Sequence, residues 1–180
     1  LILGIVSMFA IYSTAGGNYD YHTKSHILRF GIFFILFLVI SFIKVKFWFQ
    51  TSTLIYLSFL LLLLGVKYFG LTSSGSQRWI NLYIINLQPS ELMKIGLIIF
   101  LAKYYHRIPT NDVNKIKFLF LPIVALVAPV LLVVAQPDLG TAVLIAAGGL
   151  MVSWLAGVRI KFFAYASILF LSLAPIAISF

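Results

Sequence analysis

Four charged residues border long apolar runs in a chain that otherwise carries few charges. Glu91 and Lys94 are three residues apart, so on a helix they share one face and can pair. Asp138 comes just before another apolar run, and Arg78 lies in a polar stretch ahead of Glu91. A carboxylate can take a proton from a reacting hydroxyl, and a cation can stabilise an anionic leaving group. Placing an ionisable side chain inside a membrane costs free energy, so such residues are usually present for a function. These four residues therefore predict a functional site.

Helix capping is the alternative explanation for both acids. The segments 88–91 (QPSE) and 136–138 (QPD) each combine a proline near the first helical position with an acid in the first turn of the helix. Proline needs no partner there, and the helix dipole favours a negative charge at that end. Capping and chemistry therefore both remain open for Glu91 and Asp138. Lys94 lies one turn deeper, and capping does not explain a lysine there. The alternative to a functional role for Lys94 is that its long side chain extends outward to reach water.

Arg78 and Trp79 also have two interpretations. Both residue types are common anchors at a membrane interface. Alternatively, Arg78 and Gln77 contact an anionic head group, since a guanidinium can bind phosphate through two parallel hydrogen bonds.

Metal and nucleophile chemistry has little support in the sequence. His22 and His26 have the i, i+4 spacing of a zinc helix, but no adjacent Glu or third ligand accompanies them. There are no cysteines, and no glycine-rich phosphate loop, G-x-S-x-G or H-E-x-x-H motif is present. We therefore predict no metal site and no firm cofactor, although a divalent cation could take part.

The elements that position these residues are apolar helices. The chain is 62% hydrophobic and only 9% charged, against about 25% charged in soluble domains. Runs of nearly 20 apolar residues match the length of a transmembrane helix rather than a barrel strand. We therefore predict an all-α fold, a polytopic transmembrane helical bundle with seven spans. The predicted spans are residues 1–12, 27–43, 47–66, 89–105, 118–135, 141–157 and 162–180.

The basic residues predict the orientation of these spans. The net charge of +9 comes from basic residues in short loops. This distribution indicates membrane topology and not nucleic-acid binding. Eight basic residues fall in the second, fourth and sixth loops, and four in or beside the first, third and fifth. The eight are Lys44, Lys46, Lys103, Arg107, Lys115, Lys117, Arg159 and Lys161; the four are Lys24, Arg29, Lys67 and Arg78. The positive-inside rule then places the N-terminus in the cytoplasm.

Both ends of the chain lie inside apolar runs, and the first residue is Leu rather than Met. We expect residues 1–180 to form a single integral-membrane domain, truncated at its C-terminal end and by a few residues at its N-terminal end.

Three motifs occur in order along the chain: GSQRWINL, QPSELMK and QPDLGTA. With these motifs, the chain resembles the SEDS family (shape, elongation, division and sporulation; RodA, FtsW and SpoVE) over its whole length. The second motif and the QRW form are more similar to the elongation type, RodA, than to the division type, FtsW.

The resemblance implies a fold and a set of site residues. Members of the family have about ten transmembrane helices, and their principal base is an Asp in a large outer loop, expected beyond residue 180. Supporting catalytic roles would fall to Asp138, Glu91 and Lys94. Substrate binding would fall to Trp79, Arg78, Gln77, Gln88 and Ser90.

The resemblance also implies an activity, which is peptidoglycan glycosyl transfer. A hydroxyl of one lipid II would attack the anomeric carbon of the growing glycan and release undecaprenyl pyrophosphate. The implied partners are a class B penicillin-binding protein, which is a transpeptidase, and elongation-complex membrane proteins, in the bacterial inner membrane; no nucleic acid is expected. Three alternatives stay open: a division-type member, a flippase or transporter of lipid-linked precursors, and a scaffold that only binds a transpeptidase.

Overall fold

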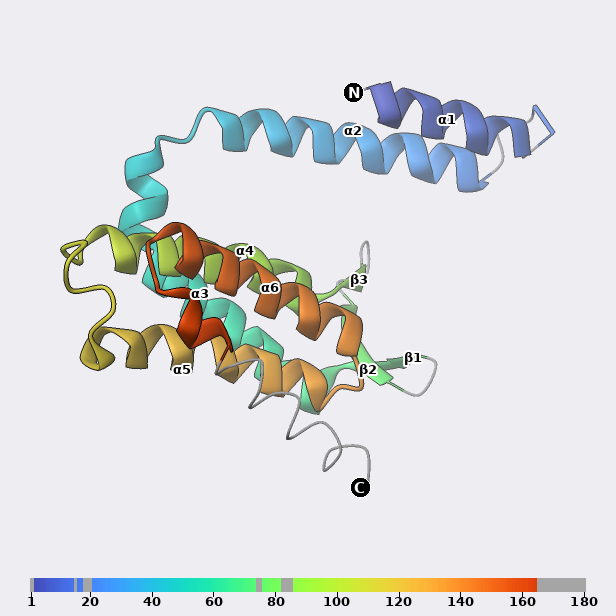
Figure 1. The fold of residues 1–180 in the computed structure, drawn as a ribbon. Coiled ribbons are helices and arrows are strands. Elements are labelled where there is room, and N and C mark those ends of the chain that lie inside the picture. The colour runs from blue at the N-terminus through green and yellow to red at the C-terminus, as the bar shows by residue number, and fades with distance from the viewer. Residues whose placement is uncertain (1, 15, 18–20, 74–75, 82–85, 165–180) are drawn as a thin grey trace. The chain divides into compact units, whose positions relative to one another are not determined.

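The computed structural model describes residues 2–14, 16–17, 21–73, 76–81 and 86–164 (Figure 1). These residues belong to two compact units, Leu1–Phe47 and Trp48–Phe180, each of which is described by itself. The seventh predicted span, 162–180, lies outside the described residues after position 164.

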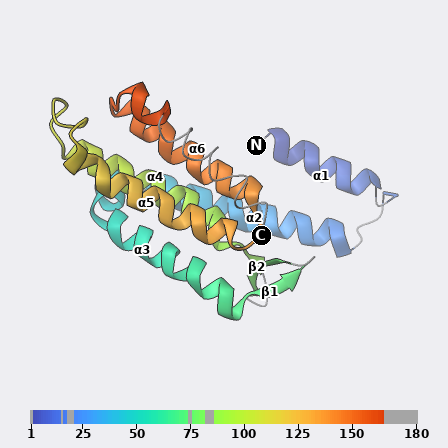
Figure 2. The same cartoon turned by 60° about the horizontal axis from the view of Figure 1, so that its bottom comes forward.

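The first unit is a pair of antiparallel helices, α1 (Ile2–Thr14) and α2 (Tyr21–Ser41), which lie side by side (Figures 1 and 2). They match the first two predicted spans, but α2 begins six residues earlier than the apolar run at 27–43. A helix can continue through polar residues, because its backbone hydrogen bonds do not depend on side-chain polarity. The apolar run therefore indicates which part of the helix faces lipid, and it does not show where the helix begins. Ser7 Oγ lies 3.1 Å from His26 Nε2, which joins the two helices.

The described part of the second unit is built mainly on four helices, α3 (Val45–Phe69), α4 (Pro89–His106), α5 (Ile116–Val134) and α6 (Leu139–Leu155). The predicted spans 47–66, 89–105, 118–135 and 141–157 are confirmed within three residues at each end. Helices α4, α5 and α6 pack against one another (Figure 2).

The core of the second unit lies where these helices meet. Leu97 and Leu101 of α4 are fully buried. A Cβ placed on Gly149 of α6 would come 2.5 Å from Leu126 of α5 and 3.2 Å from Leu97. These distances show that the neighbouring helices approach this glycine closely. A small residue lets helix backbones approach closely, which is how membrane helices gain packing energy.

Two prolines inside α5 are accommodated by tyrosines from neighbouring helices. Pro122 and Pro129 have no N–H to donate to the carbonyls four residues earlier, Phe118 and Ala125. The Tyr104 hydroxyl donates to the Phe118 carbonyl at 2.9 Å, and the Tyr56 hydroxyl donates to the Ala125 carbonyl at 2.9 Å. Both freed carbonyls are therefore satisfied inside the bundle, as membrane helices require.

The segment between α3 and α4 departs from the purely helical prediction. It contains three short antiparallel strands, β1 (Leu71–Ser73), β2 (Ser76–Asn81) and β3 (Asn86–Leu87), in the order β1-β2-β3. Strands of two to six residues are too short to produce a clear alternating pattern in the sequence. They do not change the fold class, which is a polytopic helical membrane bundle, and they position Arg78 and Trp79.

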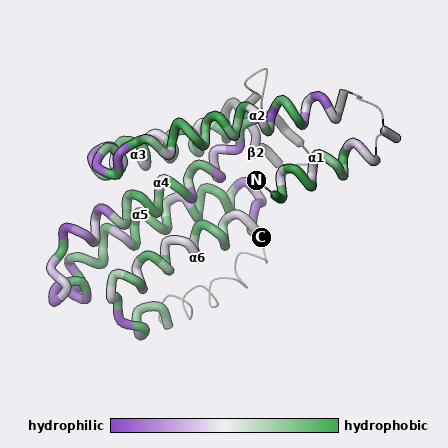
Figure 3. Tube along the Cα trace, turned by 90° about the horizontal axis from the view of Figure 1, so that it is seen from above, coloured by the Kyte–Doolittle hydropathy of each residue, from purple (hydrophilic) through white to green (hydrophobic). Residues whose placement is uncertain are grey.

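The described helices have the apolar surfaces of membrane spans. Three of them are long and apolar enough to cross a membrane, over Thr23–Ser41, Val45–Val66 and Ile116–Val134, while α1 and α6 are shorter apolar helices. In Figure 3 the hydrophobic colour predominates along α5, and hydrophilic residues gather at the connection between α4 and α5. Large apolar side chains such as Leu121, Ile123 and Leu131 are exposed on α5, as expected of a surface that faces lipid.

Candidate functional site

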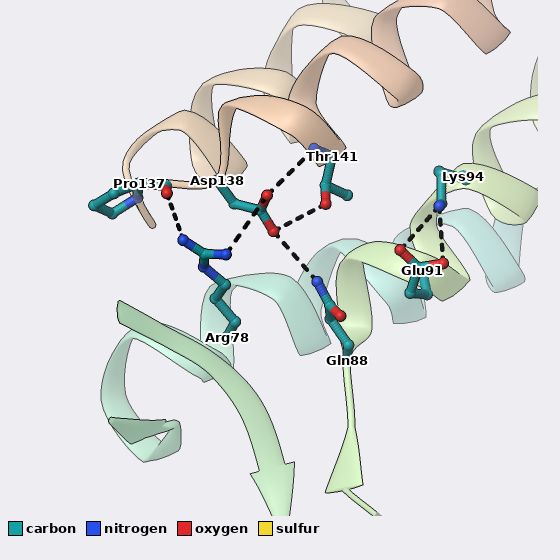
Figure 4. Close-up of polar contacts among 7 residues, drawn as sticks. All are labelled: Arg78, Gln88, Glu91, Lys94, Pro137, Asp138 and Thr141. Carbon is teal, nitrogen blue, oxygen red and sulfur yellow. Dashed lines mark hydrogen bonds and ion pairs between the residues drawn. The ribbon is translucent and has the colours of Figure 1, made fainter. Parts of the chain in front are cut away.

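Polar side chains meet at the end of the second unit where α4 and α6 begin and β2 contacts α4 (Figure 4). They form two groups. One group, here called the Asp138 cluster, consists of Asp138, Arg78, Gln88, Thr141 and the Pro137 carbonyl. The other is the Glu91–Lys94 pair, in which Glu91 lies in the first turn of α4 and Lys94 one turn further along.

Asp138 is the N-cap of α6, and its carboxylate receives donors from three elements. Oδ1 accepts a hydrogen bond from the Thr141 backbone N–H at 3.2 Å. Oδ2 accepts from Thr141 Oγ1 at 2.9 Å and from Gln88 Nε2 at 3.3 Å. Arg78 Nη1 adds an ion pair to Oδ1 at 3.8 Å. The residue is only 8% exposed, so these contacts lie mostly out of solvent.

Arg78 joins β2 to the turn between α5 and α6. Its Nη2 donates to the Pro137 carbonyl at 2.6 Å, across 59 residues of sequence. Within the part of the chain that the structure describes, its Nε is buried and has no hydrogen-bond partner. The guanidinium is therefore held by both the carbonyl of Pro137 and the carboxylate of Asp138, a combination that the sequence spacing did not predict.

Glu91 and Lys94 form the ion pair that their spacing predicts. Lys94 Nζ lies 2.9 Å from Oε1 and 2.8 Å from Oε2 of Glu91. The Glu91 side chain is 53% exposed, whereas that of Lys94 is 25% exposed. The cation is therefore the more enclosed partner.

The two acids begin their helices differently. In α4, Gln88 is the N-cap, Pro89 occupies the first turn and Glu91 is the acid of that turn, as the capping alternative predicts. In α6, Asp138 is itself the cap and Pro137 precedes it, so the prediction of a first-turn acid after a helical proline is wrong there. The Asp138 side chain bonds the N–H of Thr141, three residues on, which is ordinary capping geometry.

Three further predicted residues lie in β2 or at the start of α4. Trp79 follows Arg78 in β2 and is 36% exposed. Ser90 is buried at the start of α4, with 3% of its surface exposed. For Gln77 the structure describes only the backbone, which pairs with Thr72 of β1.

Two residues of this end were missed by the sequence analysis. Thr141 lies three residues after Asp138, and the residue at that position of a helix often interacts with the N-cap residue. The spacing of the two residues could therefore have indicated this contact. Gln136 donates its buried side-chain amide to the Leu63 carbonyl of α3 at 3.1 Å. No local pattern indicates that contact, because Leu63 lies 73 residues away.

Metal ligands do not gather among the described residues. Across those ranges, no group of three or more His, Cys, Asp or Glu side chains could hold a metal ion. A divalent cation in the reaction stays a prediction.

The chain is similar to relatives that carry two names, MrdB and FtsW. It is 32% identical over 178 residues to the peptidoglycan glycosyltransferase MrdB of Escherichia coli K12. The aligned region covers 98% of this chain and 47% of MrdB. It is 35% identical over 144 residues to the probable peptidoglycan glycosyltransferase FtsW of Buchnera aphidicola from Schizaphis graminum, covering 79% of this chain and 40% of that protein. The chain thus spans less than half the length of these relatives.

A solved structure has the same fold. The crystal structure of the rod shape determining protein RodA of Thermus thermophilus superimposes with a TM-score of 0.74 at 25% identity, over 93% of this chain and 57% of that one. The model of the FtsW, RodA and SpoVE family, described as cell cycle protein, matches residues 1–180. Because that match covers the chain from end to end, the chain belongs to the FtsW, RodA and SpoVE family.

Proposed function

We propose that this chain is part of a peptidoglycan glycosyltransferase that polymerises lipid II into glycan strands during cell elongation. The observation that carries the proposal is the convergence of the Glu91–Lys94 pair and the Asp138 cluster at one end of an apolar helical unit. A lipid-linked sugar needs such a surface, since its tail lies among apolar helices while its head group meets charged residues at the membrane boundary. The names of the E. coli and Buchnera relatives support the same activity.

The reaction needs a base and a cation. The attacking sugar hydroxyl must lose its proton as it bonds to the anomeric carbon, and the departing pyrophosphate carries negative charge. Lys94 is suited to the second task, because its ammonium contacts only the half-exposed Glu91 among its described partners. Arg78 is less available to a phosphate, since it already binds Asp138 and the Pro137 carbonyl. The principal base is proposed to be an Asp beyond residue 180.

The other predicted residues keep their proposed roles at the same surface. Trp79 is exposed enough to contact a sugar or the lipid, Gln77 lies two residues before it in β2, and Ser90 lies in the first turn of α4. We place this end of the bundle on the outer face of the bacterial inner membrane, with the N-terminus in the cytoplasm, because the basic loops lie at the other ends of the spans. A class B penicillin-binding protein and elongation-complex membrane proteins are the proposed partners.

Polymerisation by the purified full-length protein tests the activity. The protein and its penicillin-binding partner, in detergent, should convert labelled lipid II into glycan strands resolved by gel electrophoresis. A variant of the partner without its transpeptidase nucleophile separates strand synthesis from cross-linking. Failure to form polymer under conditions where a known glycosyltransferase succeeds would exclude the enzyme.

The same preparation distinguishes the alternatives. A flippase reconstituted in liposomes would move labelled lipid II across the bilayer without forming polymer, and a scaffold would do neither. The elongation role is supported by the likeness to RodA. Depletion of the protein should then produce round cells, whereas a division-type protein would give filaments.

A further inference from the structure

The Asp138 carboxylate is already occupied by donors, which bears on what it can do in the proposed reaction. An ionised carboxylate offers about four lone-pair positions. Thr141 supplies two hydrogen bonds and Gln88 a third, while Arg78 adds an ion pair at 3.8 Å, on a residue that is 8% exposed. A general base needs a lone pair within hydrogen-bond reach of the hydroxyl that it deprotonates. Hydrogen bonds take three of the four positions on Asp138, and the Arg78 cation lies beside Oδ1, so the carboxylate is poorly placed to act as that base.

Two of the three residues that contact the Asp138 carboxylate, Gln88 and Arg78, come from elements that carry another part of the candidate site (Figure 4). Gln88 is the N-cap of α4, and its carbonyl accepts from the Glu91 N–H at 3.1 Å. Arg78 precedes Trp79 in β2. Thr141 belongs to the first turn of α6. A single buried carboxylate therefore joins the start of α4, the strand β2 and the start of α6.

We propose that Asp138 is a positioning residue: its carboxylate holds Gln88 and Arg78 against the start of α6, and so places Glu91 and Trp79 for the reaction. This inference rests on the proposed glycosyltransferase function. It assigns the proton transfer to another group and gives Arg78 and Gln88 positioning roles in place of direct contact with the substrate. Misplacement of reacting groups by about 1 Å can cost a hundredfold in rate, so positioning alone can make Asp138 important.

A compensating pair of substitutions tests the contact itself. In the full-length protein, Asp138→Asn removes the charge, and Gln88→Glu places two carboxylates together. Each single variant should lower kcat about tenfold or more, as expected when a hydrogen bond to a charged group is lost. In the double variant, the amide introduced at position 138 can donate to the carboxylate introduced at position 88, so the pair is restored with donor and acceptor exchanged. Activity should return to within about threefold of wild type. A double variant no more active than the weaker single variant would overturn the proposal.

The pH profile separates positioning from proton transfer. Asp138→Asn should lower kcat at every pH while keeping the ionisation limb of the wild-type profile, because the base lies elsewhere. Loss of that limb in Asp138→Asn would show that Asp138 is the titrating group and would refute a purely positioning role.

Hydrogen–deuterium exchange provides a readout that needs no activity and covers the case in which Asp138→Asn fails to fold. Arg78→Gln leaves the carboxylate in place but removes the charge that joins β2 to α6. It should speed exchange in residues 76–81 and 86–91, and Asp138→Asn should do the same. The matched control is Asp112→Asn, which removes an acid paired with Lys115 in the connection between α4 and α5 and should change neither exchange nor activity. Unchanged exchange in Arg78→Gln would contradict the positioning role, whereas an inactive wild-type protein would count only against the proposed function.

Discussion

Lys94 Nζ lies 2.8 Å from Oε2 and 2.9 Å from Oε1 of Glu91, so the ammonium contacts both carboxylate oxygens one turn along α4. The pair lies at the end of the second unit that also holds the Asp138 cluster (Figure 4). The two groups are separate: none of the described contacts joins Glu91 or Lys94 to Asp138. Glu91 and Lys94 can therefore be altered without breaking the contacts that bind α6 to β2.

Glu91→Gln should reduce polymerisation of lipid II by about tenfold or more with little loss of stability. The pair is partly exposed, and such pairs contribute about 0–1 kcal/mol to folding. Without the Glu91 carboxylate, the Lys94 ammonium is no longer held in one position. This should weaken its contact with a bound pyrophosphate more than it changes the stability of the fold. Initial rates and melting midpoints in detergent measure the two effects.

The chain offers a matched control for this prediction. Asp112 and Lys115 have the same three-residue spacing and an ion pair of 2.8 Å, but lie in the connection between α4 and α5. Asp112→Asn should leave both rate and midpoint unchanged. Wild-type polymerisation by Glu91→Gln would instead return Glu91 to a capping role.

Asp138→Ala should destabilise the protein more than Asp138→Asn. Asparagine is a good N-cap and keeps an oxygen for the Thr141 N–H, whereas alanine leaves that donor and the Gln88 amide without their acceptor. Loss of the cap alone costs about 1–2 kcal/mol. Thermal unfolding, monitored by size-exclusion chromatography, gives the melting midpoints of the two variants and so the order of their stabilities. Equal midpoints would mean that the cap contributes nothing to folding.

Tyr56→Phe should destabilise the wild-type protein but not a Pro129→Ala variant. In the wild type, removal of the hydroxyl leaves the buried Ala125 carbonyl without a donor, at a cost of about 1–3 kcal/mol. An alanine at position 129 supplies the missing backbone N–H, so the tyrosine is no longer needed. The coupling energy from the double-mutant cycle should be about 1 kcal/mol or more.

The second proline of α5 repeats this test independently. Tyr104 donates to the Phe118 carbonyl, which Pro122 leaves free. Tyr104→Phe should therefore couple to Pro122→Ala in the same sense. Additive effects in both cycles would show that water or another group satisfies these carbonyls.

Gly149→Ala should lower the melting midpoint relative to Gly148→Ala. Both changes raise helix propensity by about 1 kcal/mol, so propensity cancels in the comparison. At Gly149 the new methyl group would lie 2.5 Å from Leu126 and 3.2 Å from Leu97, whereas at Gly148 the nearest atom, on Ile98, is 3.6 Å away. Overpacking typically costs about 1–3 kcal/mol. A lower midpoint for Gly148→Ala would contradict the packing at this face.

The helices were predictable from the sequence because a membrane leaves few choices. An apolar run of nearly 20 residues must satisfy its backbone within itself, and the helix does so. The predicted runs consequently match α3 to α6 within three residues at each end. The strands β1 to β3 were not predicted, since their pairing joins short segments and depends on the helices that bring those segments together.

The sequence by itself determined the Glu91–Lys94 pair, because the geometry of one helix places residues three apart on the same face. Only the tertiary structure decided the partners of Asp138. Gln88 is 50 residues away, and Arg78 reaches Pro137 across 59 residues. It likewise decided which tyrosines satisfy the carbonyls freed by Pro122 and Pro129. Contacts within a helix follow from spacing, whereas contacts between elements follow from how those elements pack, which local spacing does not encode.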